Sequence, residues 1–224
     1  MEKKELEKQV DAKFKNSCMN LLISNYSLKA KKRLLEIKDE NDLLVGEVRY
    51  DYKSCKFCEL GAITTLNLSA SVQHSKIGDI LKNTGINYDI PPYTGYPMVI
   101  RRYNFLRNQK YPGGEDFSFY SQENIDERIN DFIAPLEKDI IPRIDHYLNH
   151  KETLFEDIIT KQDYYKYPYA TLLITLYLNK KNSIENINIL KGKAMQANLY
   201  DVKFSADINE KISSYFNSAN FNIV

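Results

Sequence analysis

The chain has 224 residues, of which 43% are hydrophobic, and its 31 Lys and Arg residues almost cancel its 30 Asp and Glu residues. A chain of this length can bury a sizeable core, because the fraction of surface removed from water on folding rises with length. The net charge of +1 supplies no overall field that would attract nucleic acid or an anionic membrane. Composition therefore predicts a globular protein and argues against nucleic acid as its partner.

The N-terminus and the cysteines predict a cytoplasmic protein. Residues 1–8 alternate charges, where a secretory signal needs an apolar stretch behind a basic start. Apolar runs such as Leu172-Leu173-Ile174 are three residues long, far below the roughly 20 residues that span a bilayer. Three cysteines are an odd number and too few for a disulfide framework, which favours a reducing compartment. We expect neither export nor membrane insertion.

The first elements in chain order are a helix and a hairpin. Apolar residues recur four apart, which is typical of one face of an amphipathic helix, at Leu6, Val10, Phe14, Cys18 and Leu22. A basic break follows at residues 29–32. Residues 33–38 and 43–52 then alternate like strands on either side of a polar four-residue segment, 39–42, of hairpin length.

Residues 61–72 predict the type of sheet. Their side chains alternate between a largely apolar face and a largely polar one. An antiparallel sheet covered by helices on one side gives this pattern, whereas a parallel sheet buried on both faces gives continuous apolar strands. We therefore predict an α+β fold. A short helix is expected after Ser75, with its end at Gly85.

The second half of the chain predicts mainly helices. Residues 86–120 are interrupted by Pro and Gly, with a strand expected at 98–105. A long helix should follow an N-cap at Ser121, and Pro135 and Pro142 should kink or divide it. Further helices are expected at 154–159, 169–178, 184–194 and 208–216. The predicted organisation is an α+β domain over residues 1–150, in which the N-terminal helix and the long proline-kinked helix pack on the antiparallel sheet. An all-helical cap over 151–224 packs on this domain as one structural unit.

Two cysteines and two histidines form a candidate metal or thiol site. Cys55 and Cys58 have the spacing of redox pairs and of half a zinc site, and His146 and His150 lie one helical turn apart. Each pair also has a structural interpretation. Cys55 and Cys58 can be small apolar side chains at the end of a strand, and a His150 cation can interact with the carbonyl end of a helix. The separation of 88 residues between Cys58 and His146 is longer than compact zinc sites use. We expect no cofactor, and a metal-dependent or thiol enzyme is the alternative hypothesis.

The irregular segment 88–120 interleaves aromatic residues with arginines. Tyr and Arg are enriched at protein-interface hot spots, while aromatics near arginines can also stack nucleobases or roof a core. The neutral overall charge favours protein over nucleic acid as the ligand. The candidate binding residues are Tyr93, Tyr96, Arg101, Arg102, Tyr103 and Arg107.

The order of the predicted elements is similar to that of known domains. Helix, hairpin, alternating strand, short helix, strand and then the proline-bearing helix Ile133–Pro142 resemble uncharacterised bacterial α+β domains, some of which look like immunity proteins of polymorphic toxin systems. The resemblance covers about residues 1–160 and implies a bacterial protein-binding domain. The chain contains no phosphate-binding loop, dinucleotide fingerprint or nucleophile elbow, which argues against an enzyme. We therefore predict a cytoplasmic bacterial protein-binding domain of unknown specificity.

Overall fold

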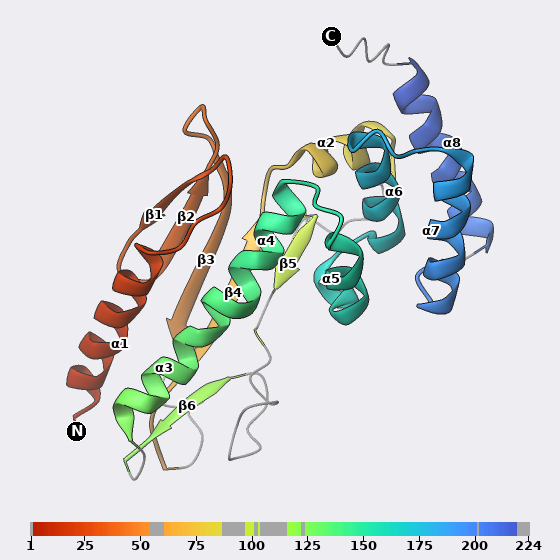
Figure 1. Ribbon diagram of the computed structural model, residues 1–224. Coiled ribbons are helices and arrows are strands. Elements are labelled where there is room, and N and C mark those ends of the chain that lie inside the picture. The colour runs from red at the N-terminus through yellow and green to blue at the C-terminus, as the bar shows by residue number, and fades with distance from the viewer. Residues whose placement is uncertain are drawn as a thin grey trace. The chain divides into compact units, whose positions relative to one another are not determined.

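The computed structural model describes residues 2–53, 61–86, 97–100, 103, 116–121, 124–200 and 202–218. It confirms the predicted α+β class, with an antiparallel sheet, an N-terminal helix and a series of helices toward the C-terminus (Figure 1). The chain forms two compact units, Met1–Gln73 with Val99–Ile144 and His74–Met98 with Asp145–Val224. The predicted boundary after residue 150 stays a prediction.

The described strands form a six-stranded sheet in the order β1-β2-β3-β4-β5, with β6 also paired to β4. The β1–β2, β2–β3, β3–β4 and β4–β6 pairs are antiparallel. Because β4 is 11 residues long, its first half can pair with β6 through Leu66 and Phe117, while the N–H of Tyr103 donates to the Leu68 carbonyl (2.7 Å). The strands are β1 (Ser27–Ala30), β2 (Leu34–Lys38), β3 (Leu44–Tyr52), β4 (Ala62–Val72), β5 (Met98–Ile100) and β6 (Phe117–Tyr120).

The predicted hairpin is confirmed as β2 and β3. In its turn, Asp39 Oδ1 accepts the backbone N–H groups of Asn41 (2.9 Å) and Leu43 (2.8 Å), and Asp42 adopts a left-handed φ of 61°. This is the role that aspartates play in turns.

The basic break expected at residues 29–32 is wrong in its first half. Lys29 and Ala30 belong to β1, which pairs with β2, and Lys29 lies opposite Glu36. An edge strand tolerates lysines because its outer side faces water and charge discourages pairing with other chains. The four residues of β1 form too short and too basic a pattern for the sequence alone to predict a strand.

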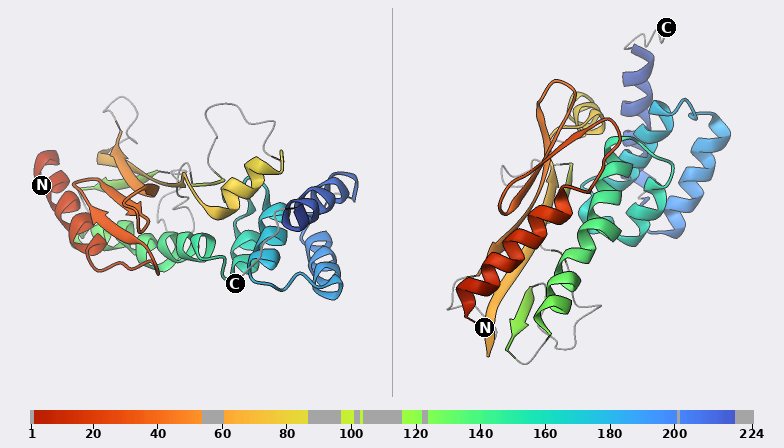
Figure 2. Two further views of the ribbon diagram at one scale, coloured as in Figure 1. Left: turned by 90° about the horizontal axis from the view of Figure 1, so that it is seen from above. Right: turned by 60° about the vertical axis from the view of Figure 1, so that its left-hand side comes forward.

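One face of the sheet is apolar and the opposite face polar, as predicted. Inward side chains such as Val48, Leu68 and Phe119 are fully buried, whereas Arg49 and Asp51 on the opposite face are exposed. Helices α1 (Lys3–Cys18) and α3 (Ile125–Pro135) lie side by side on the apolar face (Figure 2). Their shared core contains aromatic rings in edge contact, including Phe14–Tyr50 (centroids 4.8 Å apart) and Tyr50–Phe132 (5.4 Å).

The two prolines divide the long helix, as predicted. Helix α3 ends at Pro135, a π-helical turn η4 spans Leu136–Ile140, and α4 runs Ile141–Leu148. Within this turn the Ile141 N–H bonds the carbonyl five residues earlier, which widens the helix just before the ring of Pro142 would clash with the preceding turn. The predicted cap at Ser121 is wrong: Asn124 caps α3 by accepting the Glu127 N–H (3.4 Å), because an N-cap must directly precede the first helical turn.

The second unit is helical, and α6 is its central element. Helix α6 (Pro168–Leu178) packs with α2 (Lys76–Asn83), α5 (Leu154–Thr160), α7 (Ile184–Gln196) and α8 (Val202–Ser218). Neighbours on several sides explain why its sequence is apolar all round. The predicted cap of α2 is confirmed, since Ser75 Oγ accepts the Gly78 N–H (2.9 Å) and Gly85 has a φ of 70°. None of the described helices combines the length and apolar character that crossing a bilayer requires.

Candidate functional site

Of the six candidate binding residues, the structure describes Tyr103. Tyr103 is half-buried, and its hydroxyl donates to Asp139 Oδ2 (2.8 Å) on η4. Arg143 on α4 pairs with the other oxygen of the same carboxylate. The ring of Tyr103 is therefore tied to the first unit. Tyr93, Tyr96, Arg101, Arg102 and Arg107 lie outside the described residues, and their role in binding stays a prediction.

The two candidate histidines make different interactions. His146 Nδ1 pairs with Asp157 of α5. His150 lies beyond the last turn of α4, with a left-handed φ of 50°, and its Nε2 is buried without a hydrogen-bond partner among the described residues. No group of three or more His, Cys, Asp or Glu side chains suited to a metal ion occurs among the described residues. Cys55 and Cys58 lie outside them.

Burial decides the charge of His150. Burial and the nearby Lys76 lower its pKa to about 4, so the imidazole is neutral at neutral pH. The hypothesis that a His150 cation stabilises the end of the helix is therefore wrong. What the residue supplies is the backbone conformation of the helix end, where Lys151 N–H reaches the His146 carbonyl (2.9 Å).

A buried charge cluster lies between α1 and the hairpin, where the sequence predicted only an apolar stripe. Asp11 is 7% exposed and accepts hydrogen bonds from Arg33 Nε (2.9 Å), Tyr52 (3.3 Å) and Tyr50. Burial opposes ionisation of Asp11, but the hydrogen bonds from Arg33, Tyr50 and Lys32 outweigh it and hold its pKa below the usual value. Burial raises the pKa of Tyr50, whose ring is fully buried. The enclosed carboxylate of Asp11 therefore joins α1 to the hairpin.

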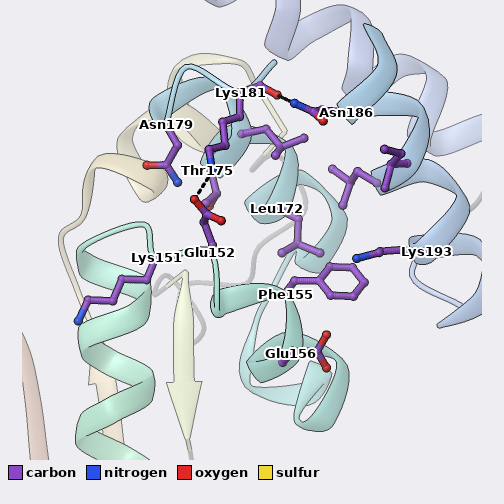
Figure 3. Close-up of a pocket in the computed structure, with 13 residues that line it drawn as sticks. Lys151, Glu152, Phe155, Glu156, Leu172, Thr175, Asn179, Lys181, Asn186 and Lys193 are labelled. Atoms are coloured by element: carbon purple, nitrogen blue, oxygen red, sulfur yellow. Dashed lines mark hydrogen bonds and ion pairs between the residues drawn. The ribbon is translucent and has the colours of Figure 1, made fainter. Parts of the chain in front are cut away.

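The second unit contains a groove that is open to a ligand, between α5, α6 and α7 (Figure 3). Its volume is about 370 Å³. Each wall is one stripe of a helix, since the lining positions recur at the spacing of three, four and seven residues that places side chains on one face. The lining residues are Lys151 and Glu152 before α5, Phe155 and Glu156 on α5, Leu172, Thr175 and Leu176 on α6, Asn179 at the end of α6, Lys181 in the following loop, and Asn186, Ile189, Leu190 and Lys193 on α7.

The floor of the groove is apolar. Phe155 and Leu172 lie next to each other at its centre (Figure 3), and Leu176, Ile189 and Leu190 complete it. Leu172 and Leu190 are buried, but Ile189 is 50% exposed. A branched aliphatic side chain that is half in water gains free energy when a ligand covers it, about 25 cal/mol per Å² of apolar surface removed.

Charged side chains form the rim. Lys181 pairs with Glu152 across the mouth, and Lys151 pairs with Asp145 while pointing away from the floor (Figure 3). The Lys193 ammonium lies 5.1 Å from the centre of the Phe155 ring. Among the described residues, no carboxylate lies within ion-pairing distance of Lys193. Within the described part of the chain, the contact that holds the Lys193 cation is therefore the one with the Phe155 ring.

The groove was missed because its residues come from three helices that the sequence predicts separately. A signal existed in α7, where Ile184, Ile187, Ile189 and Leu190 cannot share one face of a helix. Leu190 is buried, whereas Ile184 is 82% exposed and Ile189 half exposed. Such surplus apolar residues indicate a second contact surface on the helix.

The groove combines an apolar floor with a charged and polar rim. The described residues that line it include no His, Cys or Ser, and the Thr175 hydroxyl donates to the Thr171 carbonyl (2.8 Å). An apolar floor with a small number of directed polar groups is the usual composition of a recognition site. Comparisons with protein-family models, with curated proteins and with solved structures found no match, so the function rests on this geometry.

Proposed function

We propose that the chain is a protein-binding domain of the bacterial cytoplasm, of the immunity type, and that it binds its partner in the groove between α5, α6 and α7. The observation that carries the proposal is the half-exposed Ile189 beside the apolar floor of a groove of about 370 Å³. Apolar clefts rimmed by polar groups are typical protein-interaction sites. The aromatic and arginine-rich residues Tyr93, Tyr96, Arg101, Arg102, Tyr103 and Arg107 would add a second contact surface.

The matched pair Ile189→Glu and Ile184→Glu tests the site. Both isoleucines are on α7 and at least half exposed, but Ile189 lines the groove and Ile184 does not. We expect a partner captured by the full chain from its source cells to bind the Ile189→Glu variant about 100-fold more weakly, because the charge would enter an apolar floor. Binding to the Ile184→Glu variant should stay within about threefold of the unaltered chain. Titration calorimetry with the purified partner measures both.

Equal affinities of the partner for the two variants would contradict the proposal that the partner binds in the groove. The immunity assignment has a separate test in the neighbouring genes and in a toxicity assay. A toxin gene adjacent to this one, whose product is neutralised when the two proteins are co-expressed, supports it. Full toxicity in the presence of this chain contradicts it.

A further inference from the structure

The segment that forms the α7 side of the groove is rich in positive charge, and two of its lysines, Lys181 and Lys193, line the groove. Residues 179–196 contain four lysines, Lys180, Lys181, Lys191 and Lys193, against the single Glu185. Lys181 is occupied by Glu152. Lys193 lies over Phe155 with no ion-pairing carboxylate among the described residues. A cation in contact with a ring and beside an apolar floor interacts more strongly with an added anion than one in open water.

Lys193 and Ile189 are four residues apart on α7, so they form one contact unit. The spacing places the ammonium and the exposed aliphatic side chain on the same face, one helical turn apart. Both line the groove together with Asn186 and Leu190, at the same helical spacing. The surface that best matches such a stripe carries an apolar side chain and a carboxylate one turn apart on a helix of its own.

From these contacts we infer that the groove binds an acidic amphipathic helix of the partner protein. One apolar side chain of that helix packs on Phe155, Leu172 and Ile189, and an Asp or Glu one turn away pairs with Lys193. The inference rests on the proposed function and adds to it the chemistry of the partner. Glu156, on the α5 side of the groove (Figure 3), disfavours the opposite orientation, in which the carboxylate would face α5.

A phage-displayed peptide library selected on the immobilised full chain supplies a probe while the natural partner is unknown. We expect the selected peptides to combine Leu, Ile or Phe with Asp or Glu at a spacing of three or four residues. The best peptide, labelled with fluorescein, is then titrated against the unaltered chain and its variants by fluorescence anisotropy.

Lys193→Glu and Lys191→Glu are the matched pair for this titration. The change in charge is the same, but Lys191 does not line the groove. Lys193→Glu should weaken peptide binding about tenfold and Lys191→Glu less than threefold. Replacing the acidic residue of the peptide with Lys should restore binding to the Lys193→Glu variant, which a misfolded variant could not do.

Selected peptides without an acidic residue, or with affinity unchanged by Lys193→Glu, would overturn the inference, and so would a selection that yields no peptide sensitive to Ile189→Glu. The proposed function fails separately. A natural partner whose binding is lost in Ile189→Glu but unchanged in Lys193→Glu leaves the groove as the binding site and removes its acidic specificity. A partner sensitive to neither variant removes both.

Discussion

The backbone of His150 helps to fix the end of α4, while its side chain leaves a buried nitrogen atom without a hydrogen bond among the described residues. Its left-handed φ of 50° and the Asn179 Nδ2–H bond to its carbonyl (2.7 Å) fix the junction of α4 and α5. The residue is half-buried, and its Nε2 atom is buried and unpaired among the described residues. Spacing in the sequence made His146 and His150 candidate ligands. It did not show the burial and the backbone conformation of His150, because both depend on distant segments of the chain.

The lowered pKa of His150 makes stability depend on pH. The folded state binds this proton only below about pH 4, whereas the unfolded chain binds it from about pH 6.5. Between these values the unfolded state holds more protons, so stability falls as the pH falls. Asparagine tolerates a left-handed φ, and we therefore expect His150→Asn to lose less thermal stability than the unaltered chain between pH 7 and about pH 4.5.

Scanning calorimetry at the two pH values measures this difference. His74→Asn is the control, because it makes the same change at an exposed position. An equal loss of melting temperature in His150→Asn and in the unaltered chain would contradict the assignment.

At the scale of elements, Asp11 joins α1 to the hairpin. Arg33, at the start of the hairpin, and Tyr50 and Tyr52 on β3 all reach this one carboxylate. Asp11→Asn removes the charge that these donors stabilise and should lower the free energy of unfolding by about 2 kcal/mol. The pKa of Asp11 is lowered, so its contribution is present above the unfolded pKa and is lost as the pH falls through the folded pKa.

Urea unfolding near pH 7 measures the effect of Asp11→Asn. Asp51→Asn, an exposed position on β3, is the control and should change stability by less than about 0.5 kcal/mol. An equal loss in the free energy of unfolding in both variants would show that the hydrogen bonds to Asp11 do not stabilise the fold. The expected difference should shrink in strong acid, because Asp11 is then protonated in the unaltered chain.

Elements with strong local signals were predictable and those that depend on distant neighbours were not. The turn chemistry of Asp39, the cap at Ser75 and the division of the long helix by its prolines follow from backbone rules that act over a few residues. β1 was missed because a lysine such as Lys29 fits a strand at the edge of a sheet. Which strand lies at the edge depends on how the whole sheet is assembled, so the local sequence does not reveal it. The groove was missed for the same reason, since Phe155, Leu172 and Ile189 meet only after three helices have packed.

At the scale of the whole molecule, the two compact units interleave along the chain. Helix α2 belongs to the second unit and packs on α6, about 90 residues later in the sequence. A fragment that ends at residue 150 would leave Ile77, Ile80 and Leu81 of α2 without that cover. Each buried aliphatic side chain contributes about 1.5–3 kcal/mol by leaving water.

We therefore expect fragment 1–150 to bind the dye ANS far more strongly than the full chain and to unfold at lower temperature. The same fragment with Ile80→Lys should bind less ANS, because one of the uncovered apolar side chains is removed. A fragment that binds no more dye than the full chain would support the boundary predicted after residue 150.

Helix α6 contains a segment that is prone to aggregation when it is exposed. Residues 170–178, Ala-Thr-Leu-Leu-Ile-Thr-Leu-Tyr-Leu, contain no charge, no proline and no glycine, and such segments form intermolecular β-structure once they are exposed. In the folded chain, α2, α5, α7 and α8 shield this segment. Loosening α7 would uncover it along the groove, so we expect damage to the groove to lead to aggregation. A ligand bound in the groove would shield the same segment from other chains.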